Sequence, residues 1–563
     1  MRYDHLRCAP AHGMRHAYVL AVLWLLAACA AAPRAPVGVA QPDDDATTQI
    51  ETARRLAWSA ERARNDRAAA EDWLRCAAMA WRPMAQSRGE NAGMAVSLAS
   101  RCTEGLLATV LRQGPPAWKP GPTRIAGLDV DVDFRHLSTY FSGPLHLALA
   151  ADVPADLYHG ERHTTPGFGI PLALIAPRCN DRPLCEHLPP EGVFRQATAW
   201  VEFEPGAPMP RLVIADPLVV GTAQAGDRRY PLASDTSAFF AYGAGTSRLH
   251  ALGIWGLLYG NEVGRRAGLY LLEDYDPRKR PIVMIHGLAS SPLIWARLSN
   301  AIWGDPVLHA RYQVWHMVYQ TNAPTLVLRR RVREYLDDAW AALDPEGDDA
   351  ARQGMVLIGH SLGGVLSRLL CVDSGEALWN AAFTAPLADF TGDAEDLELA
   401  NEVFHFAPYP GVGRAIFIAS PHGGSPSADR FFGRLLRQLV GQRAPEVEAL
   451  KRIARENPSY VSEDLRGLSR RGLLNSLTSL QPGQPVRAAA QQLLPGPAIP
   501  YHTIAGNQPG SDPPGDGYVP LASALLPGAA STLVVESDHG VQDNAEAVAE
   551  VLRILHEDAA VEH

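Results

Sequence analysis

The sequence predicts an α/β protein whose mostly parallel sheet is covered by helices and is preceded by a helical segment and a β-rich region. From residue 266 onward, short apolar runs alternate with helix-like segments, which is typical of parallel sheets. The run VLI at 356–358 leads through Gly-His-Ser-Leu-Gly into a helix-like pattern. Upstream, an Ala-rich stretch gives way to a stretch rich in Pro and Gly. A chain of 563 residues also exceeds one hydrophobic core, so several domains are expected.

Composition narrows the class of partner. The formal net charge is −10, and 20% of the residues are charged. An acidic surface repels phosphate backbones, so nucleic acid is not a predicted partner. The sequence contains no dinucleotide-binding glycine fingerprint, no Walker loop and no cluster of metal-ligand residues. No cofactor or metal is therefore predicted, and the oligomeric state stays open.

The N-terminus has the pattern of an export signal. Arg15 and His16 precede an apolar run at 17–28, which ends in Leu-Ala-Ala-Cys at 26–29. Residues 1–28 are therefore interpreted as a signal peptide, and the last four residues resemble the lipobox of bacterial lipoproteins. The resemblance implies acylation of Cys29 and a lipid anchor in the cell envelope. By resemblance to the sorting rules of such lipoproteins, Ala30 after Cys29 favours the outer membrane, on its periplasmic or its outer face. The alternative is a plain signal peptide with an incidental cysteine.

Three segments follow the signal. Residues 30–46 are small, Pro-bearing and acidic, which indicates a flexible tether. Residues 47–118 have apolar residues at helical spacing and predict two or three helices, with a break near 87–91. Residues 119–265 contain short alternating runs and predict a β-rich accessory domain, whose function the sequence does not indicate.

Export permits disulfides. Cys179 and Cys185 bracket a polar loop, and Cys76 and Cys102 lie on two helix-like segments, so each pair is a candidate disulfide. Cys371 would then stay single. The alternative is that all five are small buried residues.

The segment 266–563 is the predicted catalytic domain. Its six strand-like runs are RPIVMIHG, YQVWHMVYQT, MVLIGHS, RAIFIASPHGG, IPYHTIAGN and STLVVESDHG, which begin at residues 280, 312, 355, 414, 499 and 531. Residues 325–342 predict a helix after the second run. Each run ends in polar or glycine-bearing residues, and open parallel sheets carry their sites beyond the carboxyl ends of the strands. The candidate site is therefore expected there.

Ser361 is the candidate nucleophile. Gly359-His360-Ser361-Leu362-Gly363 places a serine at a strand-to-helix turn, where a strained backbone lifts the hydroxyl above the sheet. Gly359 and Gly363 would avoid collisions between a Cβ and the neighbouring strand or helix. A serine among glycines is more often an ordinary turn. The apolar strand before it and the helical pattern after it favour the nucleophile.

A serine hydroxyl needs a base, and the base needs an orienting acid. Among the downstream histidines, His539 directly follows a strand and lies in Ser-Asp-His-Gly, so it is the predicted base. Asp516 lies in a glycine-framed turn and is the predicted acid, with Asp512 as the alternative. Asp538 adjoins His539 in sequence and is poorly placed to reach the far ring nitrogen.

Acyl chemistry also requires donors for an oxyanion. The backbone N–H groups of Leu362, at the start of the helix, and of Leu288, after Gly287 in the first strand's loop, are the predicted pair. Gly287 would let that loop approach closely. His286 is interpreted as structural. His422, in Pro-His-Gly-Gly, has either a functional or a loop-shaping role, and the second is favoured.

Five motifs, in this order, resemble those of a known family: IHGLASSPLIW, IGHSLGG, SPHGGS, GDGYVP and SDHG. Together they look like α/β-hydrolase lipases and esterases, including bacterial lipases and GPI-inositol-deacylase-like hydrolases, over residues 268–555. The resemblance implies Ser361, His539 and Asp516 as a catalytic triad on an α/β-hydrolase fold. Many secreted bacterial lipases bind calcium through an Asp two residues after the catalytic His. Val541 stands there instead, so the resemblance does not extend to that site.

Two long insertions, near 373–412 and 426–498, interrupt the pattern and predict a cap over the nucleophile. The second contains DRFFGRLLRQLV at 429–440, which would line an acyl pocket or touch lipid; an ordinary packed helix is the favoured alternative. The leading hypothesis is a serine hydrolase that cleaves lipid or acyl esters near a membrane. The alternatives are an acyltransferase or thioesterase with the same triad, and a non-catalytic envelope scaffold.

Overall fold

The structure is a computed structural model of the whole chain. It describes residues 46–561 except 88, 115–117, 126, 205, 247–265, 322, 426–443, 464–465 and 467–483. The predicted signal, Cys29 and nearly all of the tether lie outside the described residues, as does the amphipathic segment 429–440.

Three helices open the described chain: α2 (Ala46–Glu61), α3 (Asp66–Gln86) and α4 (Glu90–Arg112). Asn65 caps α3 by accepting a hydrogen bond from the N–H of Ala68 at 2.9 Å. A disulfide joins Cys76 of α3 to Cys102 of α4, the predicted pair. Helix α4 is long and apolar enough to cross a membrane, but half of its apolar window is buried within the fold. It therefore has the properties of a core helix in this domain.

The predicted β-rich domain is a six-stranded sheet in the order β1-β2-β7-β6-β5-β3. Its strands are β1 (Gly121–Ile125), β2 (Leu128–Arg135), β3 (His146–Leu149), β5 (Ile170–Ala176), β6 (Val193–Glu202) and β7 (Arg211–Ala215). Short pairs formed by β4 (Thr164–Thr165) with β10 (Ser234–Asp235) and by β8 (Thr222–Ala225) with β9 (Arg228–Pro231) flank it, together with α5 (Pro217–Val220) and α6 (Ala238–Thr246). A second disulfide closes the loop between Cys179 and Cys185.

The C-terminal domain is built on a seven-stranded sheet in the order β11-β13-β12-β14-β15-β16-β17. The strands are β11 (Gly268–Leu271), β12 (Arg280–Ile285), β13 (Tyr312–Val318), β14 (Met355–His360), β15 (Val412–Ile418), β16 (Tyr501–Gly506) and β17 (Ser531–Val535). All six predicted strand positions are confirmed, and neighbours from β13 to β17 pair in parallel. The edge strand β11, antiparallel to β13, was not predicted.

Helices cover this sheet on both faces. They are α9 (Ala296–Gly304), α10 (Pro306–Arg311), α11 (Thr325–Leu343), α12 (Leu362–Leu369), α19 (Leu521–Ala524) and α20 (Ala545–Ala559). Short 3₁₀ turns lie between the elements, among them η4 (Pro292–Trp295), η5 (Ala350–Arg352) and η8 (Val541–Asp543). Helix α11 begins at the predicted residue.

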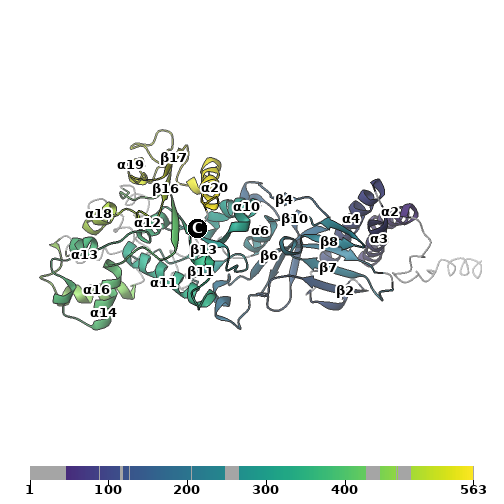
Figure 1. Cartoon of the computed structure of the whole chain (residues 1–563), viewed down its shortest axis with the longest axis horizontal. Helices are drawn as coiled ribbons and strands as arrows, with labels where there is room; N and C mark the ends of the chain where they lie inside the picture. The colour runs from purple at the N-terminus through teal and green to yellow at the C-terminus, as the bar shows by residue number, and fades with distance from the viewer. Residues whose placement is uncertain are drawn as a thin grey trace, which may run out of the picture.

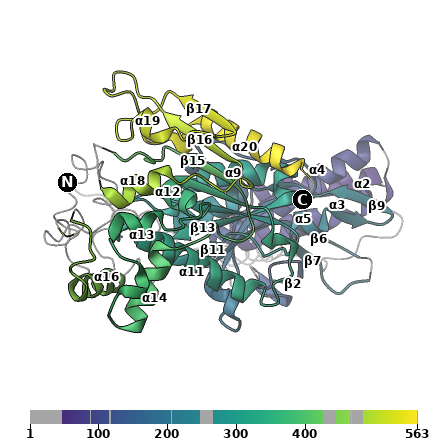
Figure 2. The ribbon, with the colours of Figure 1, turned by 60° about the vertical axis from the view of Figure 1, so that its left-hand side comes forward.

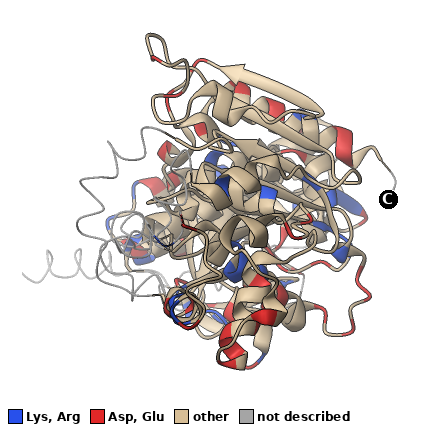
Figure 3. Cartoon of the chain, turned by 90° about the vertical axis from the view of Figure 1, so that its left-hand side faces the viewer, with Lys and Arg blue, Asp and Glu red and all other residues tan. Residues whose placement is uncertain are grey.

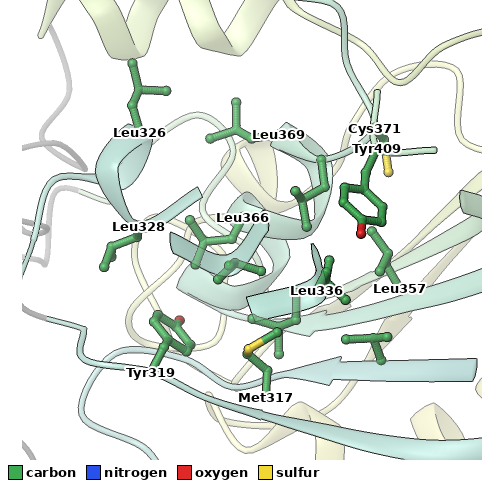
Figure 4. Close-up of a cluster of buried hydrophobic side chains, with 14 of the residues drawn as sticks. Met317, Tyr319, Leu326, Leu328, Leu336, Leu357, Leu366, Leu369, Cys371 and Tyr409 are labelled. Atoms are coloured by element: carbon green, nitrogen blue, oxygen red, sulfur yellow. The ribbon is translucent and has the colours of Figure 1, made fainter. Parts of the chain in front are cut away.

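The central strands are buried on both faces, which explains their continuous apolar runs. Figure 4 shows one of the resulting core clusters. Leu366 of α12 lies on the side of the strands with Leu336 and Leu357, whereas Leu369 and Leu326 lie farther from the strands. Helix α12 is thus packed between the sheet and a second apolar layer.

That second layer includes the two predicted insertions. They contribute α13 (Ala377–Ala382), α14 (Ala394–Phe404), α16 (Pro445–Glu456) and α18 (Pro485–Gln492), which we call the cap helices. Helix α14 packs on α16, and α13 packs on α18, so the insertions contact each other (Figure 2). Arg452 of α16 makes a two-pronged ion pair with Asp396 of α14, at 2.6 and 2.7 Å.

The three parts lie in a row, with the N-terminal helices at one end and the cap helices at the other (Figure 1). The β-rich domain packs against the C-terminal domain through Phe239 and Phe240, whose rings lie 4.8 and 5.5 Å from that of Trp303. His159 contacts Asp543 of η8 at 2.5 Å. Because η8 directly follows the loop that carries His539, the accessory domain supports the backbone behind the predicted base.

Candidate active site

Ser361 occupies the sharp turn between β14 and α12. Its φ of 54° and ψ of −123° lie in a region that non-glycine residues rarely adopt. Its N–H donates to the carbonyl of Ile418, at the end of the neighbouring strand β15, at 2.9 Å. The strain at this position is therefore held by the sheet, and the side chain points out over the carboxyl ends of the strands.

The structure brings the three predicted catalytic side chains together. Nε2 of His539 lies 2.9 Å from Oγ of Ser361, and Nδ1 of His539 lies 2.7 Å from Oδ2 of Asp516. The three residues come from loops after β14, β16 and β17. With Asp516 accepting from Nδ1–H, Nε2 is left as the acceptor for the serine proton. The arrangement has the geometry needed to activate an alcohol.

Asp516 is the buried member of the triad. Its side chain is 1% exposed, whereas that of His539 is 23% exposed. Its other oxygen, Oδ1, accepts from the N–H groups of Tyr518 at 2.9 Å and Val519 at 2.7 Å. Burial works to raise the pKa of the Asp516 carboxyl, but the hydrogen bond and charge of His539 and the two N–H groups lower it below its ordinary value. The carboxylate is therefore charged at neutral pH.

His360 supports the predicted base through a hydrogen bond to its backbone, and no feature of the sequence predicted this contact. Its Nε2 lies 2.9 Å from the carbonyl oxygen of His539, and the two rings are 4.9 Å apart. Burial and the nearby charge of His539 lower the pKa of His360 to about 3, so the ring is neutral and Nε2–H is the donor. His360 thus fixes the backbone of the residue that must accept the serine proton.

Replacing His360 by Phe is expected to lower kcat about tenfold with little change in KM. The carbonyl group of His539 would lose its hydrogen-bond donor, and the loop that carries His539 would no longer be held in place. His360→Gln, which keeps an N–H, should recover most of the loss. Steady-state kinetics on an activated ester, with thermal unfolding to check the fold, measures both. A rise in KM with kcat intact would contradict the positioning role.

The predicted oxyanion donors flank Ser361 in the fold. Leu362 is the first residue of α12, so its N–H has no partner within the helix. A Cβ placed on Gly287 would lie 2.9 Å from Cβ of Ser361, which shows how closely this loop approaches the nucleophile. Leu288 follows directly and is half-buried. Their role as a pair of donors stays a prediction.

Glycine is required at the two other motif positions by close contact. A Cβ on Gly359 would meet the carbonyl oxygen of Gly363 at 2.4 Å, and one on Gly363 would meet that of Ile285 at 2.0 Å. Both distances are far inside contact range. Any side chain here would force α12 away from the sheet and displace Ser361.

The remaining sequence candidates lie elsewhere. Asp512 and Asp538 are exposed, and the N–H of Gly540 donates to Asp538. His286 is buried, bonds the Gly287 carbonyl through Nδ1 and stacks on Tyr319, as expected of a structural residue.

Val541 is fully buried in the core. Cys371 is buried and free, and burial raises the pKa of its thiol.

A large apolar cavity lies along α12, the helix that Ser361 precedes; none of the three triad residues is in its lining. Its volume is about 580 Å³, and it is bounded by the start of α11, one side of α12, the Pro421–His422 turn and the cap helices α14, α16 and α18. Val365, one helical turn after Ser361, is part of its wall. Ser420 contacts Gly364 so closely that a Cβ there would meet its Oγ at 1.7 Å, which ties the turn to α12. The insertions thus form one wall of a cavity that runs along α12.

Residues 282–551 match a family model described as "Alpha/beta hydrolase family". This match and the strand order identify the C-terminal domain as an α/β-hydrolase fold. A search of curated proteins found no significant match.

Several solved structures are similar over about half of the chain. The mature lipase BlEst2 from Bacillus licheniformis is 18% identical, with 50% of this chain and 94% of the lipase covered and a TM-score of 0.26. Lipase 1 from Pelosinus fermentans is 14% identical, with 51% and 100% covered and a TM-score of 0.30. Esterase B from Lactobacillus rhamnosis is 13% identical, with 52% and 80% covered and a TM-score of 0.27.

Proposed function

We propose that this protein is a serine hydrolase that cleaves carboxylic esters through an acyl-enzyme on Ser361. One observation carries the proposal: a single imidazole, that of His539, contacts both the Ser361 hydroxyl and a buried carboxylate at hydrogen-bond distance. This arrangement lets the imidazole take the serine proton while the serine oxygen attacks a carbonyl carbon.

The reaction would proceed in two halves. His539 Nε2 takes the Ser361 proton as Oγ bonds to the ester carbonyl carbon, and the oxyanion is received by backbone N–H groups predicted to be those of Leu288 and Leu362. Collapse expels the alcohol, to which His539 returns the proton. Water, deprotonated by the same imidazole, then attacks the acyl carbon, and His539 returns that proton to Oγ of Ser361 as the bond from Oγ to the acyl carbon breaks and the acid leaves. Asp516 keeps the imidazole oriented and stabilises its positive charge throughout.

Lipid or acyl esters are the substrate class that the surroundings favour. The cavity along α12 has leucine, valine and phenylalanine side chains in its walls and is large enough for an acyl chain. An apolar wall on the helix that begins next to the nucleophile would bind the chain of an ester by removing its methylene groups from water.

The test is hydrolysis of p-nitrophenyl esters of increasing acyl length by the protein without its first 29 residues. Release of nitrophenol together with one equivalent of free acid is expected, with kcat/KM rising with chain length as more methylene groups are buried. Absence of hydrolysis across the series would overturn the proposal. Transfer of the acyl group to an added alcohol in preference to water would instead favour an acyltransferase.

A further inference from the structure

The cavity beside α12 contains polar groups that an ordinary acyl pocket does not need. Arg368, on α12, is 1% exposed, and His422 is 3% exposed; both line the cavity. Among the described residues, Nε of Arg368 and both ring nitrogens of His422 have no hydrogen-bond partner. Buried polar atoms are nearly always satisfied, and a buried charge without a partner is costly. These groups therefore indicate a ligand.

Arg368 is poorly compensated even where it has contacts. Its Nη1 donates to the carbonyl oxygens of Gln491 and Leu493 at 3.4 and 3.3 Å, both long for such bonds. Burial and the charge of Arg487 lower the pKa of Arg368 to about 10, so it stays a cation at neutral pH. Burial, and then the charge of Arg368, lower the pKa of His422 well below its ordinary value. His422 is accordingly a neutral neighbour of a buried positive charge.

The charge around the cavity is one-sided. Its described lining contains five cations and one acid, namely Arg368, Lys451, Arg455, Arg466 and Arg487 against Glu448. The acid is paired with Lys451 at 3.0 Å. Along the ribbon at this end of the molecule, by contrast, Lys and Arg positions are mixed with Asp and Glu positions (Figure 3). The described lining therefore carries a net positive charge, although most of its residues are apolar.

Arg368 lies on the helix that begins next to the predicted nucleophile, Ser361. Arg368 follows Ser361 by seven residues on the same helix, which corresponds to about 10 Å at a rise of about 1.5 Å per residue. Val365 and Leu369 lie on the same side of α12 and also line the cavity. A ligand that reaches from Ser361 to Arg368 would therefore cross an apolar stretch before it meets the charge.

We propose that this cavity binds an amphipathic acid, with the apolar chain against α12 and the cap helices and a carboxylate or phosphate held by Arg368 and His422. It follows that the ester cleaved at Ser361 carries such an anionic group several carbons from its carbonyl, an inference that rests on the proposed function. An anion would accept from the free Nε–H of Arg368 and from the ring N–H of His422, which would satisfy that N–H of Arg368 and one of the two ring nitrogens of His422.

The fold supplies a matched control. Arg329 of α11 is also a buried arginine, 2% exposed, and its Nε and Nη1 have no hydrogen-bond partner among the described residues. It differs in two respects: it does not line the cavity, and its guanidinium lies 3.8 Å from the centre of the Phe406 ring. Loss of Arg329 removes the same charge without touching the proposed anion site.

Binding is tested without turnover, in the Ser361→Ala protein, by calorimetric titration with dodecanoate, dodecyl phosphate and dodecanol. At least one of the two anions is expected to bind about tenfold more tightly than the alcohol, as a charge-assisted hydrogen bond provides. Arg368→Met should remove this difference, and Arg329→Met should keep it. The anion that binds more tightly identifies the head group. Equal binding of alcohol and both anions, or a preference that survives Arg368→Met, would overturn the proposal.

Kinetics then connects the anion site to the reaction. Two substrates of equal length are compared in the protein with Ser361 intact: a mono-p-nitrophenyl ester of a dicarboxylic acid, which is charged, and a neutral p-nitrophenyl ester. The charged ester should have the higher kcat/KM, so the ratio of the charged to the neutral value should exceed one. Arg368→Met should lower this ratio about tenfold. If the anion binds but neither ester is hydrolysed, the proposed function is wrong, whereas the proposed anion-binding site is retained. Hydrolysis with no preference for the charged ester would reject the substrate class alone.

Discussion

Ser361→Ala is expected to lower kcat for ester hydrolysis by a factor on the order of 10⁶, the scale seen when a serine protease loses its nucleophile. Without the hydroxyl, no acyl-enzyme can form, and His539 has no alcohol to deprotonate. The remaining rate would come from water activated in the same pocket. The measurement is p-nitrophenyl ester hydrolysis by wild type and variant at matched concentration.

A neighbouring serine provides the control. Ser367 lies on the same helix, is fully buried and donates to the carbonyl of Gly363 at 2.9 Å, away from the triad. Ser367→Ala removes one hydroxyl from the same helix and should keep most of the activity. If Ser361→Ala were as active as Ser367→Ala, Ser361 would not be the nucleophile.

Asp516→Asn is expected to lower kcat by about 10⁴-fold, the effect of the corresponding change in a serine protease triad. The N–H groups of Tyr518 and Val519 both point at Oδ1 and would select the amide oxygen there. The amide NH₂ would then face Nδ1 of His539 and donate to it. Nδ1 would become an acceptor and Nε2 would carry the proton, the wrong tautomer for a base.

Asp512→Asn is the matched variant for this experiment. Asp512 lies four residues before Asp516 and is exposed, so the same chemical change there should leave kcat nearly unaltered. The pair also separates the two acids that the sequence left open. Equal losses in the two variants, or a loss only in Asp512→Asn, would contradict the assignment of Asp516.

The sequence was sufficient for the catalytic sheet because its central strands are buried on both faces and form continuous apolar runs between clear turns. It missed β11, since Gly268–Leu271 is only four residues long and is an edge strand defined by its pairing with β13. The separation of a helical from a β-rich region was also legible from composition, but the strand order of the accessory domain was not, because it depends on long-range pairing.

The candidate site, too, contains residues that the sequence predicted and contacts that only the fold creates. Ser361, Asp516 and His539 could be chosen because each follows a strand in a short polar or glycine-bearing turn. The brace from His360 to His539 joins residues 179 apart in sequence, and no local pattern predicts it. The Arg368 cavity depends on how two insertions pack over α12, which is a tertiary property. The lipid anchor at Cys29 lies outside the described residues and stays a prediction.

The central claim is that His539 and Asp516 make the Ser361 hydroxyl a working nucleophile. Intact-mass analysis after reaction with a fluorophosphonate, followed by peptide mapping, tests it most directly because the probe forms a covalent bond only with an activated serine. One adduct per chain is predicted, located on Ser361, abolished by Ser361→Ala and strongly slowed by Asp516→Asn. A folded protein that stays unlabelled, or one labelled at another residue, would contradict the account.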